Sequence, residues 1–236
     1  GNIYNEEFSA FQATLQGPGI PSEKMLEAKA EEFIRQHNNS FVSIYLLDKY
    51  FVQKETPDFK KIKELIDVMA GVLQDKPSIG QLTENITQIE KVNEGKTAPF
   101  FSLPNQKGEK VTRLDKFKDK YMLINFWASW CEECDSTNVE LRKINNKYKK
   151  NKEFGILGIS FDINKEDWKN KIKQDTLTWE QVCTFTGWNL ETAKQYAILK
   201  LPTNIFVSPG GRILARDIPT DSLSHEIEKA LKKEKK

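Results

Sequence analysis

The chain has 236 residues, of which 30% are charged and 38% hydrophobic, a balance typical of a globular protein with one large or two small domains. Its formal net charge is only +2, so the overall charge indicates neither a nucleic acid nor an anionic membrane as a partner. Three cysteines are too few for a fold held together by disulfides, and no apolar run reaches the roughly 18 residues of a transmembrane helix. No signal peptide is visible, which leaves the compartment open because the sequence can be a mature form or a fragment.

Residues 1–95 are expected to form an all-α region. Pro21-Ser22 and Pro77-Ser78 each open a pattern with apolar residues at helical spacing, and residues 41–51 continue such a pattern. Thr56-Pro57 predicts a further helix start, with a capping hydroxyl followed by proline in the first turn. We interpret the apolar stripes of these helices as packing faces.

Residues 95–99 (GKTAP) predict a linker, and we place a domain boundary between residues 95 and 96. Segments 100–103 and 110–113 flank a turn and predict a hairpin. The alternation that follows predicts a mixed sheet flanked by helices. Its expected strands are 121–128, 154–161, 203–207 and 212–216, and its expected helices are 135–150, 166–174, 191–196 and 222–232.

A Cys-x-x-Cys motif, Cys131 to Cys134, lies between the apolar run 121–128 and the expected helix 135–150. Residues three apart at a helix start lie on one face, close enough for a disulfide. Unpaired N–H groups and the positive end of the helix dipole favour a thiolate at Cys131. The motif therefore predicts a site of thiol–disulfide exchange.

The second part of the chain, from about residue 97 to residue 236, resembles the thioredoxin fold. Within that fold it is most similar to the TlpA/ResA-like thiol:disulfide oxidoreductases. The resemblance rests on several motifs together: NFWASW at 125–130, Cys131-x-x-Cys134, Leu201-Pro202-Thr203 before a strand, and Gly187-Trp188-Asn189 ahead of residues 191–196.

The resemblance implies a location in the periplasm or elsewhere outside the cytoplasm, with membrane tethering only through a segment absent from this chain. It implies a cis peptide bond between Leu201 and Pro202, beside the disulfide. Because proline lacks an N–H, this turn leaves nearby backbone groups free to pair with a substrate strand. The implied partners are a disulfide-bearing protein substrate and an upstream redox partner, with no nucleic acid, cofactor or metal.

Three positions depart from the pattern of many relatives. Glu133 stands where they have proline before the second cysteine. Thr137 stands where they have glutamate, and Val139 where they have proline. A threonine cannot take up a proton as a carboxylate does, so the usual proton path to Cys134 is in question.

We expect Cys131 to attack a substrate disulfide and Cys134 to resolve the mixed disulfide. Glu132 and Glu133 destabilise a nearby thiolate, so the pKa of Cys131 is expected in the upper part of the range of about 3.5–7.5. A less stabilised thiolate makes the disulfide less oxidising, which favours a reductase. The substrate-docking surface is expected to comprise Trp130, Glu132, Glu133, Leu201 and Pro202.

Other interpretations of the thiols are possible. A zinc site needs a second ligand pair, and His37, His225 and Cys183 do not form one by their spacing. Cys131 and Cys134 can instead be an inert bridge in a noncatalytic interaction module whose helical region carries the binding surface. Peroxiredoxin activity is disfavoured, because Ala128 occupies the position of the activating hydroxyl.

Three further residues have simple expected roles. Trp127 lies inside a predicted strand and is expected in the core, whereas Trp130 adjoins Cys131 and is expected to be partly exposed. Cys183 is expected to be a small buried side chain without a redox role.

Overall fold

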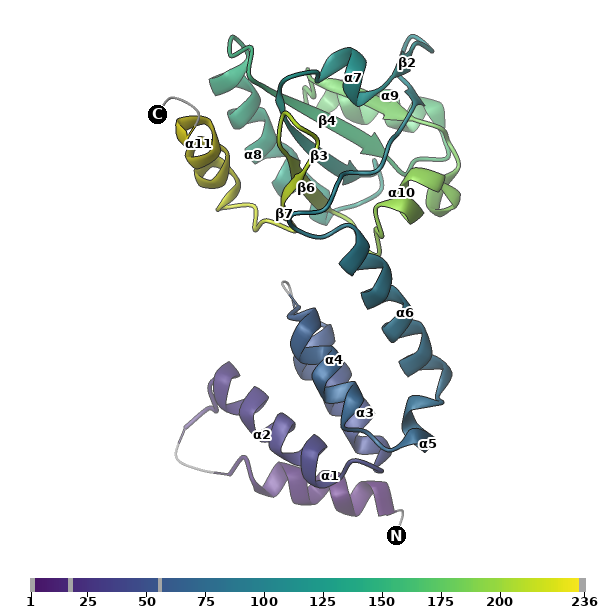
Figure 1. Ribbon diagram of the computed structural model, residues 1–236, viewed down its shortest axis with the longest axis vertical. Coiled ribbons are helices and arrows are strands. Elements are labelled where there is room, and N and C mark those ends of the chain that lie inside the picture. The colour runs from purple at the N-terminus through teal and green to yellow at the C-terminus, as the bar shows by residue number, and fades with distance from the viewer. Residues whose placement is uncertain (1–2, 17–18, 55–56, 234–236) are drawn as a thin grey trace. The chain divides into compact units, whose positions relative to one another are not determined.

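The computed structural model describes residues 3–16, 19–54 and 57–233 (Figure 1). The chain divides into two compact units, Gly1–Thr87 and Gln88–Lys236. The boundary between residues 95 and 96 stays a prediction. No helix in the described part of the chain is long and apolar enough to cross a membrane.

The first unit is built from helices, which confirms the all-α character predicted for this region. Its core includes fully buried side chains such as Ile34, Leu46, Ile62 and Leu65. The elements are α1 (Ile3–Ala13), α2 (Glu23–Gln36), α3 (Phe41–Leu47), the π-helical turn η1 (Asp48–Val52), α4 (Phe59–Asp67), α5 (Gly71–Gln74) and α6 (Pro77–Lys91), which continues past residue 87.

Side-chain caps mark the starts of α2, α3 and α4. Ser22 accepts a hydrogen bond from the N–H of Met25 at the start of α2, as Pro21-Ser22 led us to expect. The predicted start at Thr56-Pro57 was wrong: α4 begins at Phe59, and the Asp58 carboxylate accepts from the N–H of Lys61. Asp is as strong a cap as Ser or Thr, and Asp58 directly precedes Phe59, the first residue of α4. Thr56 itself lies outside the described residues.

The second unit contains a five-stranded mixed sheet in the order β5-β4-β3-β6-β7. The central strand β3 pairs in parallel with β4 and antiparallel with β6. This confirms the predicted mixed sheet flanked by helices. The strands are β3 (Tyr121–Trp127), β4 (Phe154–Ser160), β5 (Glu180–Cys183), β6 (Thr203–Val207) and β7 (Ile213–Arg216).

A short hairpin precedes this sheet, formed by β1 (Leu103–Pro104) and β2 (Lys110–Val111). The hairpin was predicted, but its strands are shorter than expected because Arg113 already belongs to the helical turn α7 (Arg113–Lys116). The Thr112 hydroxyl ends β2 and caps α7 by accepting from the N–H of Asp115.

Helices cover both faces of the sheet, with α8 and α11 on one side and α10 on the other (Figure 1). Helix α9 ends against α8, where Asp175 accepts hydrogen bonds from the side chains of Asn138 and Arg142. The elements are α8 (Glu133–Tyr148), α9 (Lys165–Gln174), the 3₁₀ turn η2 (Gly187–Asn189), α10 (Glu191–Gln195) and α11 (Leu223–Lys233).

The segment between α10 and β6 is held in place by hydrogen bonds at the end of α10. Arg216, at the end of β7, donates hydrogen bonds from its guanidinium to the carbonyls of Tyr196 and Ala197. These carbonyls end α10, where a cation also interacts favourably with the helix dipole. The Tyr196 hydroxyl donates to the carbonyl of Pro99 at 2.7 Å, and burial raises the pKa of this phenol. The segment leading to Leu201 and Pro202 therefore starts from a fixed point.

We predict that Gly158→Ala destabilises the second unit. A Cβ at Gly158 would lie 2.0 Å from Oε1 of Gln181, whose side chain is buried and bonded to Trp127. Overpacking of this kind costs about 1–3 kcal/mol. Gly210→Ala is the matched control, since the nearest atom to its Cβ is 4.0 Å away. Urea unfolding followed by Trp fluorescence measures both; equal midpoints would contradict the prediction.

Candidate functional site

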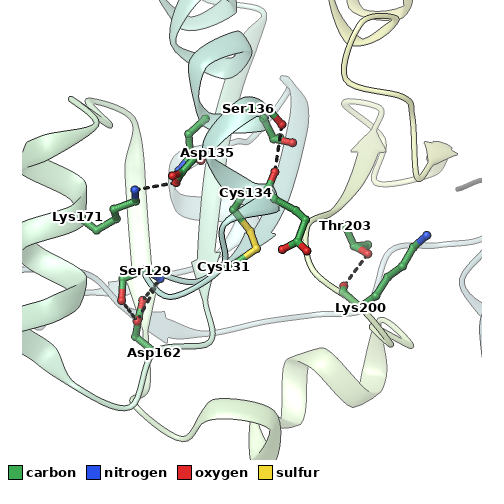
Figure 2. The surroundings of a disulfide bond; sticks show 12 residues. Ser129, Cys131, Cys134, Asp135, Ser136, Asp162, Lys171, Lys200 and Thr203 are labelled. Carbon is green, nitrogen blue, oxygen red and sulfur yellow. Dashed lines mark hydrogen bonds and ion pairs between the residues drawn. A yellow bond between two sulfur atoms is a disulfide. The ribbon is translucent and has the colours of Figure 1, made fainter.

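The two cysteines of the motif form a disulfide at the point where β3 leaves the sheet. Cys131 and Cys134 are joined by their sulfurs, with 5.3 Å between their Cα atoms (Figure 2). Helix α8 begins at Glu133, two residues earlier than predicted, so Cys134 lies in its first turn. Cys131 precedes the N-cap residue, Glu132, and its carbonyl accepts from the N–H of Cys134 at 3.1 Å.

The sulfur-bearing residues differ in exposure. Cys131 keeps 5% of its surface exposed, whereas Cys134 is 0% exposed. Cys131 is therefore the more accessible of the two residues to an incoming group. Both residues lie at the carboxyl end of β3, next to the carboxyl end of the parallel strand β4, where sites are built in open α/β sheets.

The two tryptophans of the motif lie as predicted. Trp127 is 0% exposed, and its indole N–H donates to Oε1 of Gln181 at 3.0 Å. Trp130, directly before Cys131, is 54% exposed. One ring therefore fixes the strand in the core, and the other is available on the surface beside the disulfide.

The Leu201–Pro202 peptide bond is cis, and both residues are half-buried. Figure 2 places the turn between Lys200 and Thr203 among the surroundings of the disulfide. The Thr203 hydroxyl closes this turn by donating to the carbonyl of Lys200 at 2.9 Å. Thr203 then pairs with Phe126 of β3, so the same sheet carries the turn and the disulfide.

Four acidic side chains lie in or beside the motif, and only one of them has a cationic partner. Glu132 and Glu133 are exposed, and within the part of the chain that the structure describes neither forms an ion pair. The Asp135 carboxylate lies 2.7 Å from Nζ of Lys171 and holds the pKa of that amine above its ordinary value (Figure 2). The fourth is Asp162, which is buried.

Asp162 was not predicted as a site residue from the sequence. Its carboxylate accepts hydrogen bonds from the backbone N–H and the hydroxyl of Ser129, and from the hydroxyl of Ser160 (Figure 2). The signal was present, because Asp162 follows the apolar run of β4 at the carboxyl edge of the sheet.

Many relatives hold a glutamate three residues after the second cysteine, and this chain has the uncharged Thr137 there. Thr137 is buried, and its hydroxyl lies 3.2 Å from that of Thr220. Asn125 in β3 is likewise buried and neutral, and neither of its side-chain polar atoms has a partner in the structure. These uncharged groups offer no site that takes up a proton near neutral pH.

Cys183 is a buried free cysteine, as expected. Its thiol donates to the carbonyl of Asp162 at 3.5 Å and accepts from the N–H of Phe185 at 3.3 Å. Burial raises the pKa of this thiol, so its thiolate is scarce at neutral pH. In the described residues, no group of three or more His, Cys, Asp and Glu side chains is arranged to hold a metal ion.

Residues 95–216 match the family model described as the AhpC/TSA family. The chain belongs to this family. It is 32% identical over 149 residues to the thiol-disulfide oxidoreductase ResA of Bacillus thuringiensis, a match that covers 62% of this chain and 82% of ResA. The predicted class, a thioredoxin-like thiol:disulfide oxidoreductase, is confirmed.

Solved structures agree with this assignment. A thiol-disulfide oxidoreductase from Bacteroides fragilis is 57% identical with a TM-score of 0.56, covering 57% of this chain and 99% of its own. A thioredoxin-like protein from Bacteroides caccae covers 89% of this chain and 78% of its own, with a TM-score of 0.65 and 16% identity. The second likeness shows the fold alone.

We predict that Cys183 resists alkylation in the folded, reduced protein. Its raised pKa and its burial both lower the thiolate available to iodoacetamide at pH 8. Peptide mass mapping should find Cys131 modified within minutes and Cys183 only after unfolding. Labelling of Cys183 at the rate of Cys131 would contradict the assignment of Cys183 as inert.

Proposed function

We propose that this protein reduces disulfides of protein substrates, with Cys131 as the attacking thiol and Cys134 as the resolving thiol. The observation that carries this proposal is the Cys131–Cys134 disulfide at the carboxyl end of β3. Of the two cysteines, only Cys131 keeps part of its surface exposed to solvent. A buried second sulfur is protected from outside thiols, and it remains within reach of the first. Cys131, the more exposed cysteine, is therefore the one that attacks the substrate, and Cys134 acts second.

The reaction begins with the reduced protein. The Cys131 thiolate attacks one sulfur of the substrate disulfide, that S–S bond breaks, and the second substrate sulfur leaves as a thiolate that takes a proton. The Cys134 thiolate then attacks Cys131 of the mixed disulfide. The internal disulfide forms, the substrate leaves with two thiols, and two electrons have passed to it. An upstream dithiol partner restores the reduced state by the reverse exchange.

Charge favours the reducing direction. The positive end of the α8 dipole stabilises a thiolate at Cys131, whereas the unpaired carboxylates of Glu132 and Glu133 destabilise it. We therefore expect the pKa of Cys131 in the upper part of the range of about 3.5–7.5 for such thiols. A thiolate that is less stabilised is a better electron donor, since the dithiol is then less favoured over the disulfide.

The docking surface surrounds Cys131. Trp130 offers an exposed apolar ring, and the Leu201–Pro202 turn lies among the surroundings of the disulfide. An extended substrate segment pairs with the backbone at this turn, where Pro202 contributes no competing N–H. Glu132 and Glu133 add two negative charges to the rim of this surface.

The protein is placed outside the cytoplasm by this proposal, in a periplasm or an equivalent space. The likeness to TlpA/ResA-like proteins supports that setting, where structural disulfides persist and a reductase has substrates. A membrane tether belongs to the proposal only as a segment absent from this chain.

Reduction of insulin by dithiothreitol tests the proposal. We expect the wild-type protein to accelerate the precipitation of insulin chains, and Cys131→Ala to abolish the acceleration. Cys134→Ala should trap a mixed disulfide that is visible on non-reducing gels, because the resolving thiol is missing. Cys183→Ala is the matched control and should keep wild-type activity, since Cys183 makes no disulfide.

Equal rates for the wild type and both site variants would instead support a noncatalytic interaction module. Consumption of hydrogen peroxide by the reduced protein at a rate exceeding its insulin reduction would support a peroxidase, which the sequence disfavours. Either result would reject the proposed function.

The pH dependence of alkylation tests the electrostatic part. We expect the iodoacetamide rate of reduced Cys131 to rise with pH around a midpoint of about 6–7.5, because the thiolate is the nucleophile. The double variant Glu132→Gln with Glu133→Gln should lower this midpoint, since two repelling charges are removed. A midpoint of about 3.5 for the alkylation of Cys131 in the wild-type protein would indicate an oxidase instead.

A further inference from the structure

Asp162 is the only Asp or Glu that is buried among residues 3–16, 19–54 and 57–232. It is 1% exposed, and in this part of the chain it forms no ion pair. A buried carboxylate without a cation is costly, and it persists where hydrogen bonds compensate or where its charge has a use. Its place beside the disulfide loop suggests that both apply here.

The hydrogen bonds of Asp162 reach the loop that carries Cys131. The backbone N–H of Ser129 lies 3.2 Å and 3.1 Å from the two carboxylate oxygens, and the Ser129 hydroxyl donates to Oδ1 (Figure 2). Ser129 is two residues ahead of Cys131. The carboxylate thus holds the start of the turn through two donors of one residue, which fixes its direction as well as its position.

Asp162 is itself hydrogen-bonded to Ser160, the last residue of β4. The Ser160 hydroxyl donates to Oδ2 at 2.6 Å, and the N–H of Asp162 donates back to Oγ of Ser160 at 2.9 Å. The carboxylate therefore has a fixed position at the end of β4, and its hydrogen bonds to Ser129 connect the Cys131 turn to the sheet.

We propose that Asp162 is a positioning residue that orients the Cys131 turn, and that its negative charge keeps the Cys131–Cys134 couple reducing. The inference rests on the proposed function. It adds a source of reducing character that is independent of the solvent-exposed charges of the motif.

The charge argument depends on burial. A buried charge is screened much less than an exposed one, so Asp162 acts on the Cys131 thiolate through protein rather than through water. The other charged groups at the site are exposed, as Glu132, Glu133 and Lys200 are, or paired, as Asp135 is with Lys171. Asp162 therefore makes the thiolate less favourable and the disulfide form correspondingly more favourable.

Three variants separate the effect of the Asp162 charge from the effect of its hydrogen bonds to Ser129. Asp162→Asn removes the charge and keeps an oxygen that can accept from Ser129. Ser129→Ala keeps the charge and removes one donor to the turn. Ser136→Ala is the control, because among the described residues this exposed hydroxyl donates only to the carbonyl of Glu133 and has no hydrogen bond to Asp162.

The first readout is the equilibrium of the Cys131–Cys134 couple with reduced and oxidised glutathione. We expect Asp162→Asn to shift this equilibrium towards the dithiol by about tenfold, the effect of one pKa unit, which for a two-electron couple is about 30 mV. Ser129→Ala and Ser136→Ala should stay within about twofold of the wild type. A purely structural role of Asp162 would leave the potential unchanged.

The second readout is the rate at which the reduced protein attacks a small disulfide such as cystamine. We expect Ser129→Ala to slow this rate by about tenfold at constant potential, because a loosened turn misplaces the nucleophile. Asp162→Glu should keep the wild-type potential and also slow the attack, since it retains the charge and displaces the anchor. Ser136→Ala should match the wild type.

Two results would overturn the inference. One is an unchanged glutathione equilibrium in a folded Asp162→Asn protein, and the other is a wild-type attack rate in both Ser129→Ala and Asp162→Glu. If Asp162→Asn does not fold, the second result alone decides. Failure of the proposed function is distinct, because the wild-type protein would then exchange no electrons with glutathione or cystamine.

Discussion

The site depends on the burial of β3 on both of its faces. All seven residues from Tyr121 to Trp127 are buried, which a strand achieves only in the middle of a sheet that is covered on both sides. Each large apolar side chain buried there contributes about 1.5–3 kcal/mol, so the strand has one stable location. Its carboxyl end, and with it the turn that carries Cys131, then emerges at a fixed place between β4 and β6.

The strands that the sequence could predict are those whose own residues carry the signal. The apolar runs that form β3, β4 and β6 were located within one residue of their ends, because all of their residues except Gly155 are buried. Strand β5, in contrast, was missed. Its four residues, Glu180 to Cys183, are two polar residues followed by two apolar ones, so they show no alternation, and pairing with β4 decides their conformation. Tertiary pairing of this kind leaves no local pattern.

The same distinction explains which parts of the site could be predicted. Cys131 and Cys134 are neighbours in sequence, so their spacing on a helix start was enough to predict the disulfide. Ser129 and Asp162 are 33 residues apart, and only the parallel pairing of β3 and β4 brings them together. The rule that functional groups lie beyond the carboxyl ends of parallel strands points to Asp162, but it does not identify the partner of its carboxylate.

The arrangement of buried charge distinguishes the two thiols. Many relatives hold a glutamate on the side of the resolving cysteine, where this chain has Thr137 bonded to Thr220. The buried carboxylate of this protein instead fastens the turn on the side of the attacking cysteine. Thr137 cannot take up the proton of the Cys134 thiol as a carboxylate at this position would, so we expect that proton to leave through water or through the departing substrate sulfur. The buried charge near Cys131 acts on the redox equilibrium instead, since it disfavours the thiolate and strengthens the dithiol as an electron donor. The site thus has a threonine in place of a carboxylate on the side of the resolving thiol, and a buried carboxylate on the side of the attacking thiol.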